Sequence, residues 1–93
     1  MEESKPQYDV RINRNVLRSI ERLPERIQDK FRLLAKELRD SGPIQRNWSN
    51  FSALGKGKFH CHLTQRYVAC WRHDKGTIVI EVYYVGSRQG APY

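Results

Sequence analysis

Hydrophobic positions follow a helical spacing in the first half of the chain and a strand spacing in the second half. Between residues 16 and 38, apolar side chains recur three or four positions apart, which is the spacing of the buried stripe of a helix. These side chains are Val16, Leu17, Ile20 and Leu23, and then Ile27, Phe31, Leu34 and Leu38. The pattern predicts two helices in succession.

Capping residues divide and end the predicted helices. Asn13 or Asn15 is a suitable N-cap for the first helix, because its side chain can accept a hydrogen bond from the first turn. Pro24 ends this helix and can open the next, since proline suits a first helical turn. Gly42 followed by Pro43 is a strong stop signal. We therefore expect an antiparallel helical hairpin.

Strand-like segments lie on both sides of this hairpin. Residues 8–12 alternate between apolar and polar, which predicts a short first strand. After the hairpin, residues 59–63 alternate in the same way, and residues 67–71 form a further strand. Residues 77–85 are almost all β-branched or aromatic, which is typical of a central strand covered on both faces.

The pairing of these strands depends on the turn near Gln65. One register sets Phe59 against Trp71 and Cys61 against Ala69, so that apolar residues share a face. A one-residue slip would break this matching, and the sequence leaves both registers open.

The order of elements is strand, helix, helix, strand, strand, strand. It favours an α+β fold in which the N-terminal helical hairpin packs on one face of a small antiparallel sheet. A chain of 93 residues has the size of one domain, so we assign residues 1–93 to a single domain. Residues 1–6 are expected to be a disordered tail.

Charge is distributed unevenly along the chain. The 17 Lys and Arg against 10 Asp and Glu give a formal net charge of +7. Residues 44–93 carry seven of the basic but only two of the acidic side chains. The strand-rich half is therefore expected to meet a polyanion, although a basic surface that only maintains solubility stays open.

The start of the chain is charged and polar, unlike a secretion signal, and no segment approaches the ~18 apolar residues of a membrane span. We therefore expect no membrane partner. Cys61 and Cys70 lie inside apolar segments and are expected to be reduced thiols in the cytoplasm.

Residues 55–63, GKGKFHCHL, combine lysine, histidine and cysteine at strand spacing. Lys58, His60 and His62 share one face of a strand, whereas Cys61 points to the other. One metal ion therefore cannot take both histidines and Cys61 as ligands, and no other ligand spacing is recognisable. We expect no metal and no cofactor. A solvated strand face is one alternative for the histidines.

A nucleic-acid site is another interpretation of this strand. Basic and aromatic side chains gather around the predicted strands: Lys56, Lys58, Arg66, Arg72 and Arg88, with Tyr83, Tyr84 and Tyr93. Cations hold phosphates, and rings stack on unpaired bases. Histidines titrate near neutral pH, so they can move protons. A protein that deprotonates the 2′-hydroxyl, stabilises the phosphorane and protonates the leaving oxygen cuts RNA without a metal.

Residues 8–93 resemble the RelE/ParE superfamily of bacterial toxin–antitoxin toxins. The resemblance rests on the helical hairpin, on GKGKFHCHL and YVACW, and above all on IEVYYVGSRQGAPY at residues 80–93. These motifs are similar to those of the cytotoxic translational repressor subgroup. The resemblance implies a compact microbial RNase fold, with a small antiparallel sheet and two helices on one face.

The RelE branch further implies a ribosome-dependent mRNA endonuclease that inhibits translation by metal-independent acid–base cleavage. Its implied partners are a cognate antitoxin, the ribosome and mRNA, with operator DNA reached only through the antitoxin complex.

The resemblance also implies roles for particular residues. Arg88 would stabilise the phosphate, and Tyr93 would stack on a base or help to remove the 2′-hydroxyl proton. His60 and His62 occupy strand positions where better-known members carry lysine, and Lys58 completes the expected catalytic group. The expected RNA-binding residues are Lys56, Arg66 and Arg72.

Two other functions stay open. The ParE branch shares the fold but poisons DNA gyrase, and a non-catalytic module would hold RNA or a protein partner. An RNase toxin should block translation and leave supercoiling intact, a gyrase poison should do the reverse, and a binding module should do neither.

Overall fold

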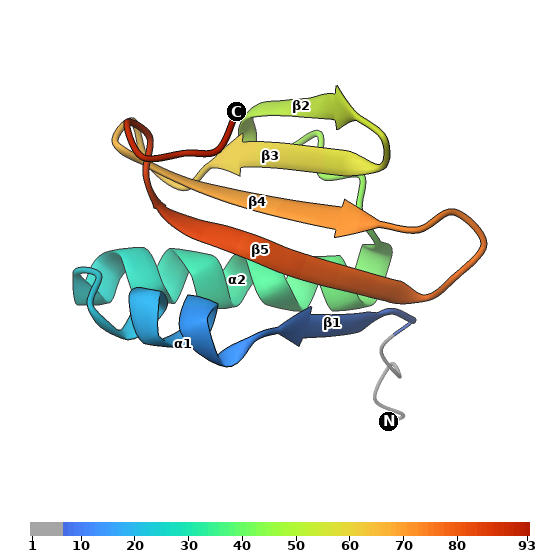
Figure 1. The fold of residues 1–93 in the computed structure, drawn as a ribbon, viewed down its shortest axis with the longest axis horizontal. Coiled ribbons are helices and arrows are strands. Elements are labelled where there is room, and N and C mark those ends of the chain that lie inside the picture. Colours follow the sequence, from blue (N-terminus) through green and yellow to red (C-terminus); the bar gives the residue numbers. More distant parts are fainter. Residues whose placement is uncertain (1–6) are drawn as a thin grey trace.

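The computed structural model describes residues 7–93, and the tail expected at residues 1–6 lies outside the described residues. Two helices lie on one side of a five-stranded sheet with the order β1-β5-β4-β3-β2 (Figure 1). The elements are β1 (Asp9–Ile12), α1 (Arg14–Glu21), α2 (Glu25–Ser41), β2 (Ser49–Gly55), β3 (Lys58–His62), β4 (Tyr67–His73) and β5 (Val79–Ser87). The predicted α+β class is confirmed.

The predicted capping residues flank the helices, but α1 ends at Glu21, so Leu23 lies in the turn before Pro24 and not in the helix. Asn13 is the N-cap of α1, and its side-chain oxygen accepts a hydrogen bond of 2.9 Å from the backbone N–H of Val16. Pro24 precedes α2, and Gly42 ends it with a φ of 97°, a conformation that favours glycine. Among residues 7–93, neither helix is long and apolar enough to cross a membrane.

The sheet contains one strand that the sequence pattern did not predict. β2 lies at the sheet edge beside β3, and its register shifts between Ser49 and Ser52 and again between Ala53 and Gly55. These irregularities, together with a positive φ of 53° at Asn50, remove the simple alternation that marks a strand.

The sheet is also mixed, because β1 pairs with β5 in parallel while the other pairs are antiparallel. The α1–α2 hairpin and the three following strands separate β1 from β5 in sequence. β5 is an interior strand, but β4 occupies the middle of the sheet, where the sequence had placed residues 77–85.

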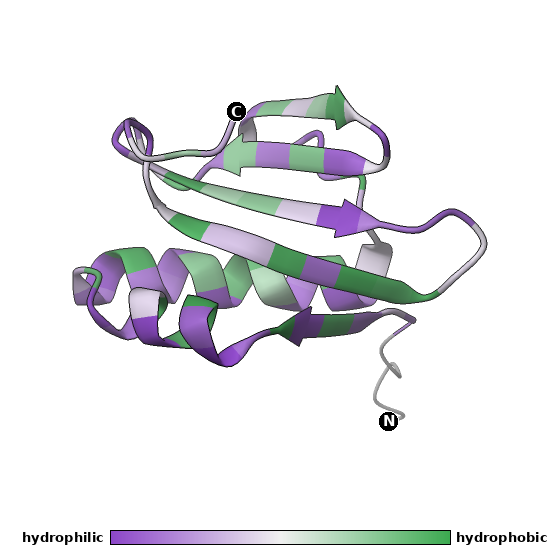
Figure 2. Cartoon of the chain, viewed as in Figure 1, coloured by the Kyte–Doolittle hydropathy of each residue, from purple (hydrophilic) through white to green (hydrophobic). Residues whose placement is uncertain are grey.

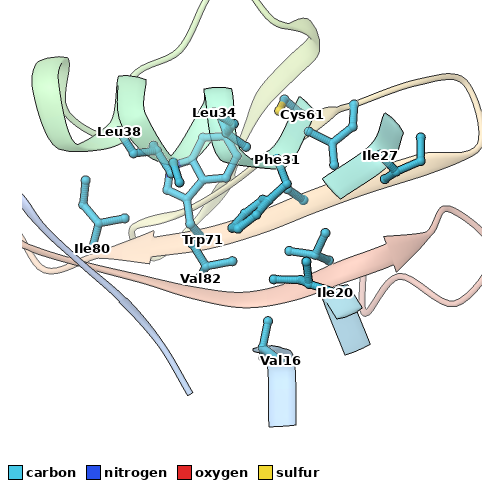
Figure 3. Close-up of a cluster of buried hydrophobic side chains, with 14 residues drawn as sticks. Val16, Ile20, Ile27, Phe31, Leu34, Leu38, Cys61, Trp71, Ile80 and Val82 are labelled. Carbon is cyan, nitrogen blue, oxygen red and sulfur yellow. The ribbon is translucent and has the colours of Figure 1, made fainter. Parts of the chain in front are cut away.

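The core lies between the helices and the sheet, and its centre is Trp71 (Figure 3). Trp71 is fully buried, and its indole N–H donates a hydrogen bond of 3.0 Å to the carbonyl of Pro43. Phe59 lies opposite Trp71, and Cys61 lies opposite Ala69, which is the register that matches apolar faces. Figure 2 shows the alternation along β3 that directs these apolar residues to the helices.

Candidate functional site

The sheet face away from the helices, here called the open face, carries two rows of polar side chains that cross neighbouring strands. Residues opposite each other in a sheet point to the same side. The first row is Lys58, Arg72, Glu81 and Arg11, and the second is Ser52, His60, Cys70 and Tyr84. The apolar residues of β3 thus lie on the helix-packed face, and its basic residues lie on the open face.

Tyr93 lies against His60 on the open face. Their ring centroids are 4.4 Å apart, and the ring planes are inclined by 54°. Ser52 Oγ lies 2.9 Å from His60 Nδ1, and the His62 ring lies 5.7 Å away between centroids. His60 is consequently only 8% exposed, so a simple solvated strand face does not describe it. His62 is half-buried.

Burial gives His60 and Tyr93 different protonation preferences. Burial, followed by the nearby His62, lowers the pKa of His60, while hydrogen bonding to Ser52 acts in the opposite direction. A neutral imidazole at pH 7 can accept a proton. Burial is also the largest cause that raises the pKa of Tyr93, and Arg88 opposes this shift. The Tyr93 hydroxyl is therefore a proton donor at neutral pH.

A compact turn brings the C-terminal segment back to β3. The backbone N–H of Arg88 donates a hydrogen bond of 2.7 Å to the carbonyl of Arg66. The Tyr84 hydroxyl donates to the carbonyl of Ser87 at 2.7 Å, and a Cβ on Gly90 would lie 3.0 Å from that hydroxyl. The close packing favours glycine at this position, and the turn directs the end of the chain toward β3 (Figure 1).

The two cysteines lie on opposite faces and are poor nucleophiles. Cys61 belongs to the core beneath the helices, whereas Cys70 shares the open face with His60. Burial raises the pKa of Cys61 to about 12 and that of Cys70 to about 11. A thiolate is the form that attacks or binds metal, so both thiols are in the unreactive form at neutral pH. Within residues 7–93, no three His, Cys, Asp or Glu side chains form a metal-binding group.

The structure brings most of the predicted site residues onto the open face but spreads them along it. His60, His62 and Tyr93 form the centre. Lys58 lies at the start of β3 with its ammonium 5.8 Å from the centroid of the Tyr83 ring.

The remaining predicted residues extend to both ends of β3. Arg72 lies opposite Lys58, and Lys56 precedes β3 in the turn from β2. At the other end of β3, Arg66 and Arg88 line a groove of about 360 Å³.

Two polar residues of the open face were missed from the sequence. Ser52 contacts His60 but belongs to β2. Because apolar and polar residues do not alternate regularly in β2, the sequence predicted neither this strand nor the face on which Ser52 lies. Arg11 belongs to the predicted first strand, where it lies between the apolar Val10 and Ile12. Successive side chains of a strand point to opposite faces, so the position of Arg11 between two apolar residues was a usable signal that its side chain faces away from the core.

No protein-family model and no curated protein matches the sequence. Solved structures, in contrast, are similar over nearly the whole chain. A chain of the archaeal RelE-RelB complex from Pyrococcus horikoshii OT3 has a TM-score of 0.72 and 16% identity, covering 91% of this chain and 99% of that chain. A mutant of E. coli toxin RelE in the free state has a TM-score of 0.70 and 15% identity, covering 91% and 87%.

A chain of the E. coli DinJ-YafQ toxin-antitoxin complex has a TM-score of 0.69 and 12% identity, covering 94% of this chain and 99% of that chain. The three structures share the two-helix and sheet arrangement described above, at identities that establish likeness of fold. They confirm the resemblance at that level: this chain has the fold of the RelE-type toxins.

Proposed function

We propose that this protein is the toxin of a toxin–antitoxin system and that it cleaves mRNA on the ribosome. The fold is that of proteins described as toxins, two of which come from complexes named for a RelE-RelB and a DinJ-YafQ pair. The observation that carries the cleavage proposal is the Tyr93 ring against the buried His60 imidazole, beside the row that contains Lys58 and Arg72. This arrangement combines phosphate binding, base stacking and proton transfer.

RNA would bind across the open face. Lys58 and Arg72 offer cations beside the centre, and Arg88 and Arg66 offer cations at the end of β3. Tyr93 is 53% exposed, so one side of its ring is free to stack on an unpaired base.

His60 is the proposed general base. Its neutral imidazole removes the proton of the 2′-hydroxyl, and the 2′-oxygen attacks the adjacent phosphorus. The bond to the 5′-oxygen then breaks, and this oxygen receives a proton from Tyr93 or His62. The products are a 2′,3′-cyclic phosphate and a 5′-hydroxyl end, and Arg88 stabilises the charge of the phosphorane. The raised pKa of Tyr93 favours this donor role over removal of the 2′-hydroxyl proton.

The partners in this proposal follow from the resemblance of residues 80–93 to the RelE branch. The ribosome presents single-stranded mRNA to the open face, and a cognate antitoxin neutralises the toxin and links it to operator DNA. The reaction uses no cofactor, since the histidines and the tyrosine supply the proton transfers. The cytoplasm, where ribosomes and mRNA meet, is the expected location.

A reconstituted translation reaction tests the proposal. The protein should cut ribosome-bound mRNA, with cleavage ends mapped by primer extension, while gyrase supercoiling stays unchanged. The double variant His60→Gln/His62→Gln should cut about 10²–10⁴-fold more slowly, the usual contribution of acid–base groups. Lys30→Gln, an exposed change on α2, is the control.

The outcomes separate the three functions. Inhibited supercoiling with intact mRNA would identify a gyrase poison. Intact mRNA and normal supercoiling, with RNA retained by the protein, would identify a binding module. Normal cleavage by the double histidine variant would show that the two imidazoles take no part in the chemistry.

A further inference from the structure

A cationic pocket lies at the end of the open face away from Arg88. It has a volume of about 470 Å³, and its walls come from β1, β3, β4, β5 and adjoining turns. Its charged lining is Arg11, Lys56, Lys58, Arg72, Asp74 and Glu81. Four cations thus face two carboxylates, and the proposed function at His60 assigns no role to Arg11 or Lys56.

The positive charge of this pocket is only partly compensated within the chain. Arg72 pairs with Glu81, and Arg11 contacts Asp9 in an exposed ion pair of 3.0 Å. Across residues 7–93, Lys56 and Lys58 form no ion pair. Lys58 also lies directly opposite Arg72, and like charges in that position destabilise a sheet. An anion bound in the pocket would offset this positive charge.

The turn that presents Lys56 is held firmly against β4. Lys56 has a φ of 55°, and Gly57 beside it has a φ of 74°. A Cβ on Gly57 would lie 2.5 Å from the carbonyl oxygen of His73, so only glycine fits here. The backbone N–H of His73 donates a hydrogen bond of 2.9 Å to the carbonyl of Gly57. This close approach fixes the turn beside the pocket.

We propose that the pocket is a subsite for a phosphate of single-stranded RNA, next to the cleavage centre. The proposal rests on the proposed function, because it continues the RNA path from His60. Lys58 lines the pocket and also lies close to the cleavage centre, because it is two residues from His60 along β3, a separation of about 7 Å. The row from Lys58 to Arg11 then crosses three strand spacings, or about 14 Å.

The chemistry of the lining favours a phosphate. A guanidinium presents a planar fork of donors that matches phosphate oxygens, and an ammonium adds a compact charge. Arg11 and Arg72 supply guanidinium groups from β1 and β4, and Lys56 supplies an ammonium from the turn. The continuity with His60 favours RNA, because a strand held in the cleavage centre would place a neighbouring phosphate at the pocket.

The salt dependence of binding tests this subsite. The probe is a fluorescent single-stranded oligodeoxynucleotide, which has phosphates but no 2′-hydroxyl and so cannot be cut by the proposed mechanism. Each phosphate contact in a single strand contributes about −0.7 to the slope of log affinity against log salt concentration. Arg11→Gln/Lys56→Gln should therefore make the slope less steep by about 1.4 and weaken binding at low salt.

The matched control is Arg18→Gln/Arg39→Gln. It removes the same charge from exposed positions on α1 and α2, across the molecule from the open face. It should lower the affinity less and leave the slope nearly unchanged. Equal slopes for the two double variants, or no binding of the oligodeoxynucleotide by the unaltered protein, would overturn the subsite.

Cleavage of ribosome-bound mRNA is measured in parallel, so that the two proposals can fail separately. A reduced slope without any cleavage by the unaltered protein would support the subsite and contradict the nuclease. Cleavage with an unchanged slope would do the opposite. If Arg11→Gln/Lys56→Gln loses affinity only for a poly-glutamate peptide, the pocket takes an acidic protein segment, and the RNA assignment is wrong.

Discussion

The ring of Tyr93 covers the imidazole of His60, with 4.4 Å between the ring centroids. This contact joins the end of the described chain to β3 and explains why His60 is 8% exposed on a face without helices. Burial is also the largest cause of the lowered pKa of His60. Tyr93 is thus one of the groups that bury His60, together with Ser52 and His62, and burial is what lowers the pKa of the proposed base.

Substitutions of Tyr93 should separate stacking from proton donation. Tyr93→Ala should abolish most of the toxicity, because a stacked base contributes about 1–3 kcal/mol, while the melting temperature changes little since the ring is 53% exposed. Tyr93→Phe keeps the ring without the hydroxyl. Full activity in Tyr93→Phe would assign the residue to stacking, and lost activity would assign it to proton donation. Growth inhibition and thermal unfolding measure the two effects, and full toxicity of Tyr93→Ala would contradict the site.

The His60 pKa should rise when its cover is removed. Tyr93→Ala exposes the imidazole to water and removes part of the largest cause of the lowered pKa, so its midpoint should move upward toward about 6.5. A titration followed by NMR of the His60 ring protons measures the midpoint without requiring activity. His62→Gln should also raise it, because His62 is the second cause that lowers the pKa of His60. An unchanged midpoint in Tyr93→Ala would show that the ring does not shield His60.

Stability should fall in mild acid because of the same histidine. The folded-state pKa of His60 lies below that of the unfolded chain, near 6.5, so between these values the unfolded state binds more protons. The free energy of unfolding should therefore decrease as pH falls below about 6.5 and stop changing on this account below the folded-state pKa. Urea unfolding of the protein and of His60→Gln measures the difference. Parallel curves for the two proteins would contradict this source of pH dependence.

The sequence predicted those elements whose apolar residues keep one period. The helical stripe through Phe31 and the alternation around Cys61 both point into the observed core. β2 was missed because its register breaks near Ser52, and the parallel partner of β1 was missed because no local pattern reports a pairing with a strand so far along the chain.

The candidate site shows the same limit. The alternation of side chains along a strand predicted that Lys58, His60 and His62 share one face, as they do in the structure. It could not show that Tyr93 covers His60, because that contact depends on the packing of a turn around Tyr84 and on the return of the chain to β3. Contacts between distant segments arise from tertiary packing, and the periodicity of side chains along the sequence does not report them.

Ser52 should act as a positioning residue for His60. Its Oγ lies 2.9 Å from Nδ1, so it can fix the ring orientation and leave Nε2 to exchange a proton with RNA. Ser52→Ala should lower kcat about 3–10-fold, the worth of one hydrogen bond, with KM nearly unchanged, because the cations that bind phosphate stay in place. Ser52→Thr keeps the hydroxyl in a strand position and should restore most of the rate. Equal rates for Ser52→Ala and the unaltered protein, or a loss confined to KM, would show that His60 does not depend on this hydroxyl for its orientation.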